Sequence, residues 1–174
     1  MADSGCTATA FLSGIKTNFG VLSMSGHVPL RNCTAEYDTE NHVDTIFKFA
    51  QAAGKSTGIV TNTRITHATP AAAYAKTASR YWENNAQTPA GCKDIGYQLV
   101  HGDIGKRLDV ILGGGYRELL PNNITDSLGR QGRRTDNKDL IQEWLKSKEL
   151  SNRSGGAKRA IYLHDRVRQH LQDL

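Results

Sequence analysis

The sequence has little of what marks several protein classes. Its three cysteines, at positions 6, 33 and 92, are scattered and form no CxxC pair, which excludes a zinc finger, a thioredoxin-type site and a disulfide-rich scaffold. The longest apolar runs have about six residues, far short of the roughly twenty that cross a bilayer. Met1 and Ala2 lead straight into the polar residues Asp3 and Ser4, which is not the pattern of a secretory signal. These absences predict a small soluble protein.

What is present fits one packed domain. With 38% hydrophobic residues the chain is too apolar for a disordered protein, and its 17 glycines and 4 prolines are too few for a collagen. Its 174 residues are the length of a single domain. The net charge of +5 leaves nucleic acid, phosphate compounds and an acidic membrane surface open as partners.

Short apolar runs rich in β-branched residues alternate with helical patterns along the chain. The expected strands cover residues 57–61, 108–112 and 160–163. The expected helices cover residues 7–15, 41–54 and 94–100, followed by one that Asp136 caps with Leu140, Ile141, Trp144 and Leu145 inward, and one that begins at Asp165. This alternation predicts a parallel sheet in an α/β layered fold. The polar residues 146–159 are expected to form a loop.

Two glycine-bearing motifs do not fit nucleotide binding. The triplet Gly54-Lys55-Ser56 ends like a phosphate-binding loop, but Phe49 stands where that motif requires glycine, and a helix precedes it where a strand should. Gly54 is therefore expected to end the helix in the left-handed conformation. The three glycines at 113–115 follow a strand without GxGxxG spacing, which favours a tight turn.

The residues Asp3, Ser4 and Gly5 precede an expected helix and allow two interpretations. Backbone N–H groups and the positive end of the helix dipole favour a phosphate or a serine alkoxide at Ser4, and Gly5 permits close approach of a ligand. Alternatively, Asp3 or Ser4 simply caps the helix. The spacing alone leaves both interpretations open.

A second candidate site lies between His67 and Arg80. Thr69 is placed to cap a short helix with Pro70 in its first turn, and both His67 and Thr69 follow the carboxyl end of the first strand, where α/β folds bind ligands. Arg80, near the end of that helix, offers a planar guanidinium suited to phosphate. The alternative is a strand-end histidine, a capping threonine and a solvated arginine.

Longer motifs resemble the alkaline phosphatase family, of the animal type. The opening DSGCTATA is similar to the family's nucleophile segment, and GKSTGIVTNTRITHATPAAAYAKTASRYWENN is similar to its strand, metal-side turn and arginine helix. GCKDIGYQLV, LDVILGGGYREL and the RxDxKxLxxEW pattern at residues 134–144 follow in family order. The resemblance makes residues 1–174 part of one such domain. It implies a three-layer α/β/α sandwich with a central, largely parallel sheet, incomplete in this chain.

The resemblance also implies roles for individual residues. Ser4 matches the nucleophile that becomes a phosphoserine and is held by zinc, and Asp3 matches the neighbour that orients the arginine. Arg80 matches the guanidinium that clamps two phosphate oxygens. Thr69 matches a magnesium ligand, and His67 matches a residue in the outer sphere of that magnesium site.

Cysteines and asparagines extend the resemblance beyond the site. Cys33 and Cys92 resemble the family's disulfide pair, which implies an oxidising compartment and leaves Cys6 free. Asn123 and Asn152 begin glycosylation sequons. The family's members are commonly homodimers that are secreted or held at the cell surface by a lipid anchor. The resemblance therefore implies an extracellular or cell-surface location.

The implied activity is hydrolysis of small phosphate monoesters through a phosphoserine, with Zn²⁺ and Mg²⁺ as cofactors and no nucleic acid as partner. The family's upstream aspartate ligand and most of its zinc ligands have no match in this chain. We therefore expect a partial enzyme with little or no activity by itself. The alternative is a noncatalytic module that binds phosphate or polyanions through Arg80 and the basic surface.

Overall fold

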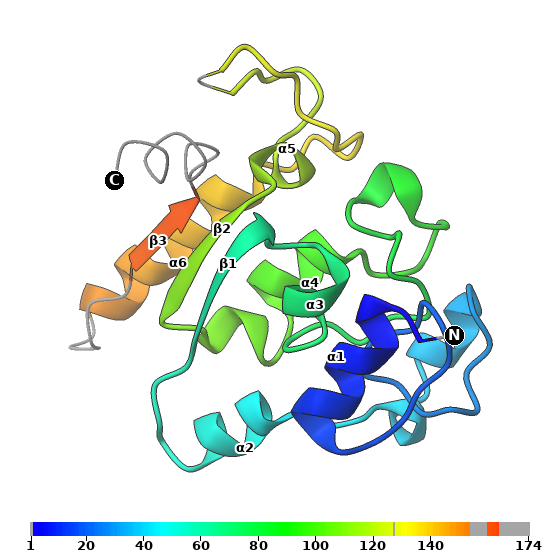
Figure 1. The fold of residues 1–174 in the computed structure, drawn as a ribbon. Helices are drawn as coiled ribbons and strands as arrows, with labels where there is room; N and C mark the ends of the chain where they lie inside the picture. The colour runs from blue at the N-terminus through cyan, green and yellow to red at the C-terminus, as the bar shows by residue number, and fades with distance from the viewer. Residues whose placement is uncertain (1, 127, 154–159, 164–174) are drawn as a thin grey trace.

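The computed structural model describes residues 2–126, 128–153 and 160–163, and Figure 1 shows their arrangement. In chain order the elements are α1 (Ser4–Ser13), η1 (Cys33–Glu36), η2 (Thr39–Asn41), α2 (Ile46–Ala52), β1 (Gly58–Arg64), α3 (Ala68–Ala71), η3 (Asn85–Gln87), α4 (Ile95–His101), η4 (Gly105–Arg107), β2 (Val110–Gly114), α5 (Tyr116–Leu119), α6 (Leu140–Arg153) and β3 (Ala160–Leu163).

The three strands form one parallel sheet in the order β1-β2-β3. Ile59 pairs with Ile111, and Ile111 pairs with Ile161, so the apolar runs lie in register across the sheet. Helices α3 and α4 lie between β1 and β2 in the chain, and α5 and α6 lie between β2 and β3, as parallel pairing requires. The predicted strands and the α/β class with a parallel sheet are confirmed.

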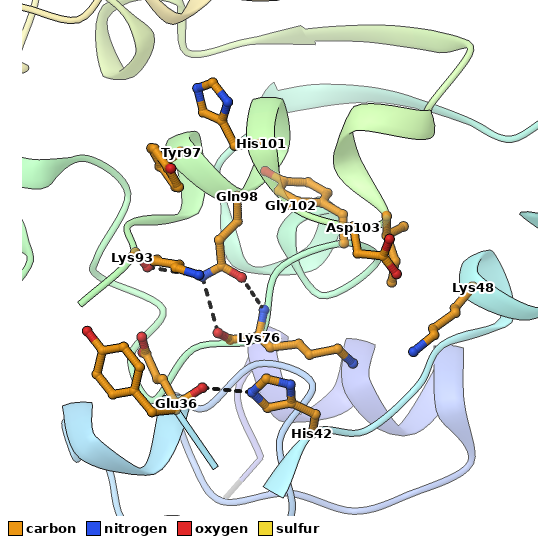
Figure 2. Close-up of a pocket in the computed structure, with 13 residues that line it drawn as sticks. Glu36, His42, Lys48, Lys76, Lys93, Tyr97, Gln98, His101, Gly102 and Asp103 are labelled. Atoms are coloured by element: carbon orange, nitrogen blue, oxygen red, sulfur yellow. Dashed lines mark hydrogen bonds between the residues drawn. The ribbon is translucent and has the colours of Figure 1, made fainter. Parts of the chain in front are cut away.

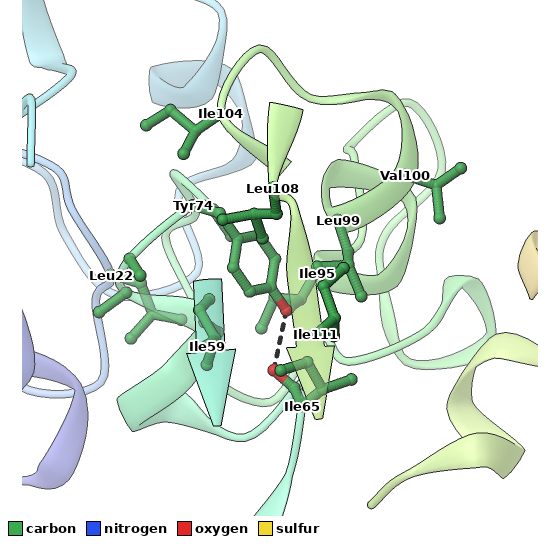
Figure 3. Packing of buried hydrophobic residues seen from close by; sticks show 14 of the residues in the cluster. Leu22, Ile59, Ile65, Tyr74, Ile95, Leu99, Val100, Ile104, Leu108 and Ile111 are labelled. Carbon is green, nitrogen blue, oxygen red and sulfur yellow. Dashed lines mark hydrogen bonds between the residues drawn. The ribbon is translucent and has the colours of Figure 1, made fainter. Parts of the chain in front are cut away.

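The core lies against one face of this sheet. Ile59 and Ile111 point into it and are 8% and 0% exposed, where they meet residues of α4 and Leu140 of α6. Figure 3 shows Tyr74 in the middle of this cluster, with its hydroxyl donating a hydrogen bond to the backbone oxygen of Ile65 at 2.9 Å. The buried phenol is thereby satisfied, and the cluster holds the turn after β1 against the sheet.

The opposite face of the sheet is open in the part of the chain that the structure describes. Val60 on β1 is 73% exposed and Val110 on β2 is 40% exposed. β1 is also an edge strand, and an apolar groove beside it is lined by residues of α1, including Phe11, and by Phe47 of α2. The second helical layer of a three-layer sandwich does not cover these valines within the described residues.

The helix predicted over residues 41–54 is shorter than expected. Asn41 does not cap it, because Asn41 is the last residue of η2 and the helix α2 begins at Ile46, after Thr45. Between the two, the Val43 N–H donates to the backbone oxygen of Ser23 at 3.0 Å, a tertiary contact that keeps this stretch out of the helix. Gly54 has φ of 70°, so its predicted left-handed conformation is confirmed.

The prediction that Asp136 caps a helix is wrong. The Asp136 carboxylate accepts hydrogen bonds from Arg134, at 3.1 and 2.6 Å. Asp139 takes the capping place, and its Oδ1 accepts the N–H groups two and three residues on at 3.1 and 3.0 Å. α6 then continues to Arg153, so the first part of the predicted loop is helical, and Leu145 is 41% exposed and does not point inward.

Two further predictions are wrong, and a third is correct in part. The N-cap of α3 is His67, so Thr69 lies within that helix and does not cap it. α3 ends at Ala71, and Arg80 follows in a stretch without helix. Gly115, with φ of 89°, turns the chain from β2 into α5, which confirms a turn at the last of the three glycines, but Gly113 and Gly114 are still part of β2. The predicted helix from Asp165 and residues 154–159 of the predicted loop lie outside the described residues.

A disulfide ties two loop segments together. Cys33 in η1 and Cys92 are bonded, with their Cα atoms 5.8 Å apart and a separation of 59 positions in sequence. This is the pair that the resemblance implies. Cys6 is free and buried. None of the described helices is long and apolar enough to cross a membrane.

Candidate functional site

The start of α1 settles which residue caps that helix. Asp3 is the N-cap, and its Oδ1 accepts the N–H of Cys6 at 3.0 Å. The Asp3 N–H in turn donates to the Sγ of Cys6 at 3.1 Å, which completes a reciprocal capping box. Ser4 is the first residue of the ten-residue helix and is partly exposed. The capping role therefore belongs to Asp3, and Ser4 lies at the positive end of the helix dipole.

Asp3 is joined to Arg80, which lies 77 residues further along the chain. The Nη1 of Arg80 donates to Asp3 Oδ2 at 2.9 Å, and its Nη2 lies 3.2 Å from Nε2 of His67. The side chains of Arg80 and Asp3 are 17% and 7% exposed. These contacts engage two of the five N–H donors of the guanidinium. The structure thus brings together three of the residues that the sequence singled out.

Gly20 is a member of this cluster that the sequence did not reveal. Its N–H donates to Asp3 Oδ1 at 3.2 Å, and its backbone oxygen accepts the N–H of Arg80 at 2.7 Å. Gly20 has φ of +74°, and a Cβ there would lie 2.9 Å from a methyl group of Leu30. Only glycine fits this position without strain. No local pattern marks it, because its partners lie 17 residues before and 60 residues after it.

Local interactions set the charge state of the cluster. Burial alone would raise the pKa of Asp3, but hydrogen bonds from Cys6, Arg80 and Gly20 outweigh it and hold that pKa well below its ordinary range. Burial, together with the positive charge of Arg80, lowers the pKa of His67. At neutral pH, Asp3 is therefore ionised and His67 is a neutral imidazole.

A second network supports the turn that carries His67. Glu83 accepts two hydrogen bonds from Arg64, at 2.8 and 2.7 Å, and one from the Thr66 hydroxyl at 2.7 Å. Burial would raise the pKa of Glu83, but these hydrogen bonds keep it below its ordinary value. The sequence analysis missed Glu83, because its partners lie 17 and 19 residues away.

Thr69 lies apart from the Asp3–Arg80 pair. It is exposed on α3 and lines the apolar groove beside β1 together with Thr7 and Ala8 of α1. Helices α1 and α3 are therefore neighbours, but no hydrogen bond among the described residues joins the Thr69 side chain to the cluster. Thr69 therefore lies at the groove beside α1, and its role as a magnesium ligand stays a prediction.

A separate cavity of about 320 Å³ contains none of the residues that the sequence singled out. Figure 2 shows Lys48, Lys76 and Lys93 around it, with His42 bonded to the backbone of Glu36. Lys48 and Lys76 share the Asp44 carboxylate, each at 3.2 Å. One carboxylate thus lies between two ammonium groups, and the cavity shares no lining residue with the Asp3–Arg80 cluster.

The charge of Asp3 gives a testable pH dependence. Its pKa is lower in the folded chain than the value of about 3.9 expected when unfolded. Asp3 therefore stabilises the fold above that unfolded value, and this stabilisation is lost as the pH falls through the folded pKa. We expect Asp3→Asn to lower the free energy of unfolding at neutral pH, with a difference from wild type that shrinks below about pH 4.

Denaturant unfolding across this pH range measures the difference. Asp38→Asn is the matched control, because Asp38 caps η2 from an exposed position and makes no ion pair among the described residues. A difference between wild type and Asp3→Asn that stays constant on acidification would show that Asp3 is not held ionised by Arg80.

Comparison with known proteins identifies the family. The alkaline phosphatase family model matches residues 1–168. The chain is 45% identical over 153 residues to the membrane-bound alkaline phosphatase of Bombyx mori, and 42% identical over 152 residues to the human tissue-nonspecific isozyme. These matches cover 84% and 82% of this chain but 28% of each relative. The chain thus spans less than a third of the length of the curated relatives that it matches.

Solved structures agree with the sequence comparison. The alkaline phosphatase of Thermus thermophilus superimposes with a TM-score of 0.62 and 25% identity, covering 99% of this chain and 32% of that one. The enzyme of the Antarctic bacterium TAB5 gives a TM-score of 0.60 and 25% identity, covering 84% of this chain and 32% of that one. By sequence and by fold, the chain belongs to the alkaline phosphatase family.

Proposed function

We propose that this chain carries the nucleophile and phosphate clamp of an enzyme that hydrolyses phosphate monoesters. The observation that carries the proposal is the Asp3–Arg80 pair, with a distance of 2.9 Å, directly beside Ser4 at the start of α1. Asp3 fixes the guanidinium, and the remaining N–H donors of Arg80 bind two oxygens of the phosphate. The helix dipole adds a favourable potential for negative charge at Ser4.

The reaction follows from this arrangement in two steps. In the first, Ser4 gives its hydroxyl proton to solvent water and its Oγ attacks phosphorus, so that the Oγ–P bond forms and the bond from phosphorus to the leaving alcohol breaks. The leaving oxygen takes a proton from water. In the second, water attacks the phosphoserine, inorganic phosphate leaves, and Ser4 regains its proton. In both steps Arg80 stabilises the charge on the phosphoryl oxygens.

Zinc and magnesium are the cofactors proposed, on the strength of the family. A solved relative, a mutant of the TAB5 enzyme with a TM-score of 0.59, is described with Mg bound. The described residues of this chain do not fit a complete metal site, because no three His, Cys, Asp or Glu side chains gather among them. The Nδ1 of His67 is buried without a hydrogen-bond partner in that part of the chain. The two steps above therefore involve only residues of this chain and water.

The metal sites lead to a prediction about activity. We expect the 174-residue chain, supplied with Zn²⁺ and Mg²⁺, to turn over 4-nitrophenyl phosphate little or not at all. We expect activity when the chain replaces its matching segment in the Bombyx mori relative, because the rest of that protein then supplies the missing ligands. Release of nitrophenol measures both.

Two outcomes contradict this view. Zinc-dependent turnover by the chain alone, abolished in Ser4→Ala, would show that it assembles its own metal sites. An inactive but folded chimera, with heparin binding to the chain that weakens steeply with salt, would favour a polyanion-binding module, to which the net charge of +5 would contribute.

The location and modification of the protein are also proposals. The Cys33–Cys92 disulfide is consistent with an oxidising, extracellular compartment, and the Bombyx mori relative is named membrane-bound. Asn123 is exposed, as a glycosylated asparagine must be, and Asn152 lies in α6. The homodimer and the lipid anchor that the resemblance implies stay predictions.

A further inference from the structure

A shallow hollow of about 530 Å³ lies beside the proposed phosphate clamp. Neither Asp3 nor Arg80 lines it, but Tyr81, the residue directly after Arg80, does. Its lining residues are Arg31, Tyr81, Trp82, Ala86, Gln87, Thr88 and Pro89. The lining is therefore mostly neutral, with an aromatic ring at the clamp side and one cation.

Tyr81 joins the hollow to the clamp. Its ring centroid lies 5.6 Å from Cζ of Arg80, within the range of a cation–π contact. The Tyr81 side chain is 51% exposed, although an aromatic ring of its size is usually more buried. A half-exposed ring next to the guanidinium offers a flat surface to whatever is attached to a phosphate bound there.

Arg31 supplies the cation of the hollow. Its N–H donates to the backbone oxygen of Ala78 at 2.8 Å, which fastens its loop to the segment that ends in Arg80. Arg31 is exposed and forms no ion pair with a carboxylate among the described residues. Arg80 differs, because Asp3 already offsets its charge. The uncompensated positive charge in this region therefore belongs to Arg31.

The backbone at Arg31 is strained. Its φ of 65° is left-handed, a conformation that is unfavourable for a residue other than glycine. Strain of this kind is concentrated at ligand clamps and other functional sites. The strained backbone, the unpaired guanidinium and the half-exposed ring are three separate observations at one hollow.

We propose that this hollow is a leaving-group subsite, in which Tyr81 stacks on a planar aromatic leaving group and Arg31 pairs with a second anionic substituent on that group. The inference rests on the proposed function, because it takes the phosphate of the same molecule to be held by Arg80. It assigns the enzyme a preference for aryl phosphate monoesters that carry a further negative charge.

Three phosphonates of increasing size separate the parts of this site. Methylphosphonate probes the clamp alone, phenylphosphonate adds the ring, and 4-carboxyphenylphosphonate adds the second charge. Their dissociation constants for the full 174-residue chain are measured by NMR titration. We expect affinity to rise along the series, with each addition contributing about five-fold.

Variants assign each gain to a residue. Tyr81→Ala is expected to remove the advantage of phenylphosphonate over methylphosphonate, and Tyr81→Phe to keep it. Arg31→Gly is expected to remove the advantage of the carboxylated probe. Glycine adopts the left-handed backbone without cost, so this change removes the guanidinium without straining the loop. Each advantage is taken as a ratio to the smaller probe measured with the same variant, so a change at the Arg80 clamp cancels.

The outcomes distinguish the subsite from the clamp. If Tyr81→Ala and Arg31→Gly leave the affinity ratios unchanged, the subsite is overturned. If methylphosphonate binds to the wild-type chain and this binding is lost in Arg80→Ala, the clamp is supported. Failure of all three probes to bind would overturn both. Aryl probes that bind through Tyr81 and Arg31 without any binding of methylphosphonate would support the hollow as an aromatic anion site and count against the clamp.

Discussion

Ser4→Ala is expected to lower the turnover of a phosphate monoester by about 10⁴-fold or more in the chimera with the Bombyx mori relative, because it removes the proposed nucleophile. The side chain lost is small, and Ser4 is the first residue of α1, where Asp3 already caps the helix. The expected loss is therefore one of chemistry and not of folding. Initial rates with 4-nitrophenyl phosphate measure the effect.

The control for this prediction lies on the same helix. Ser13 is the last residue of α1, and its hydroxyl donates to the backbone oxygen of Thr9 at 2.6 Å. Ser13→Ala removes a hydroxyl of the same kind away from the cluster and is expected to leave turnover within about two-fold. If Ser4→Ala kept a tenth of the wild-type rate or more, Ser4 would not be the nucleophile.

Arg134→Leu is expected to lower the free energy of unfolding by about 3 to 5 kcal/mol. Arg134 is fully buried and donates to both oxygens of Asp94, each at 2.9 Å, as well as to Asp136. Burial alone would lower the pKa of Arg134, but these carboxylates raise it well above its ordinary value. Leucine would leave the Asp94 carboxylate buried without its cation. Denaturant unfolding measures the loss.

Two further variants show whether an unpaired charge is the cause. Arg134→Leu with Asp94→Asn removes both charges and is expected to recover part of the stability, since the amide still accepts the cap bond from Tyr97, at 2.7 Å in the wild type. Arg107→Leu breaks an exposed pair with Asp103 and is expected to cost less than about 1 kcal/mol. Equal losses in Arg134→Leu and Arg107→Leu would contradict this account.

The parts of the fold that were predicted correctly are those that local patterns specify. Runs such as 57–61 are short, apolar and rich in β-branched residues, so they indicate strands whatever surrounds them, although in β1 only Ile59 is buried. Gly54 was predicted correctly for the same reason, since a left-handed helix end favours glycine. The class of fold follows from the order of these local elements.

The errors arose where a tertiary contact competes with a local pattern. Asn41 and Asp136 are both good helix caps by residue type, but η2 and Arg134 engage them elsewhere. The ion pair of Arg134 with Asp94 joins residues 40 apart, and no spacing rule indicates it. A sequence pattern indicates the role of a residue type when no other contact competes for that residue. In both of these cases another contact does compete.

The candidate site also combines residues that the sequence indicated with residues that only the structure revealed. Patterns in the sequence left the roles of Ser4 and Arg80 undecided, and only the resemblance to a family connected them. The structure supplies the physical link, since Asp3 bonds to Arg80 and Gly20 bonds to both. Gly20 and Glu83 became visible only through these contacts.

The most direct test of the central claim is to trap the phosphoenzyme. The chimera is incubated with a phosphate monoester, quenched in acid and digested, and its peptides are analysed by mass spectrometry. We predict one added phosphoryl group on the peptide that contains Ser4, located at Ser4 itself. The same peptide of the Ser4→Ala chimera should carry no phosphoryl group. Turnover of the ester with no phosphoryl group at Ser4, or with the group on another residue, would contradict the account.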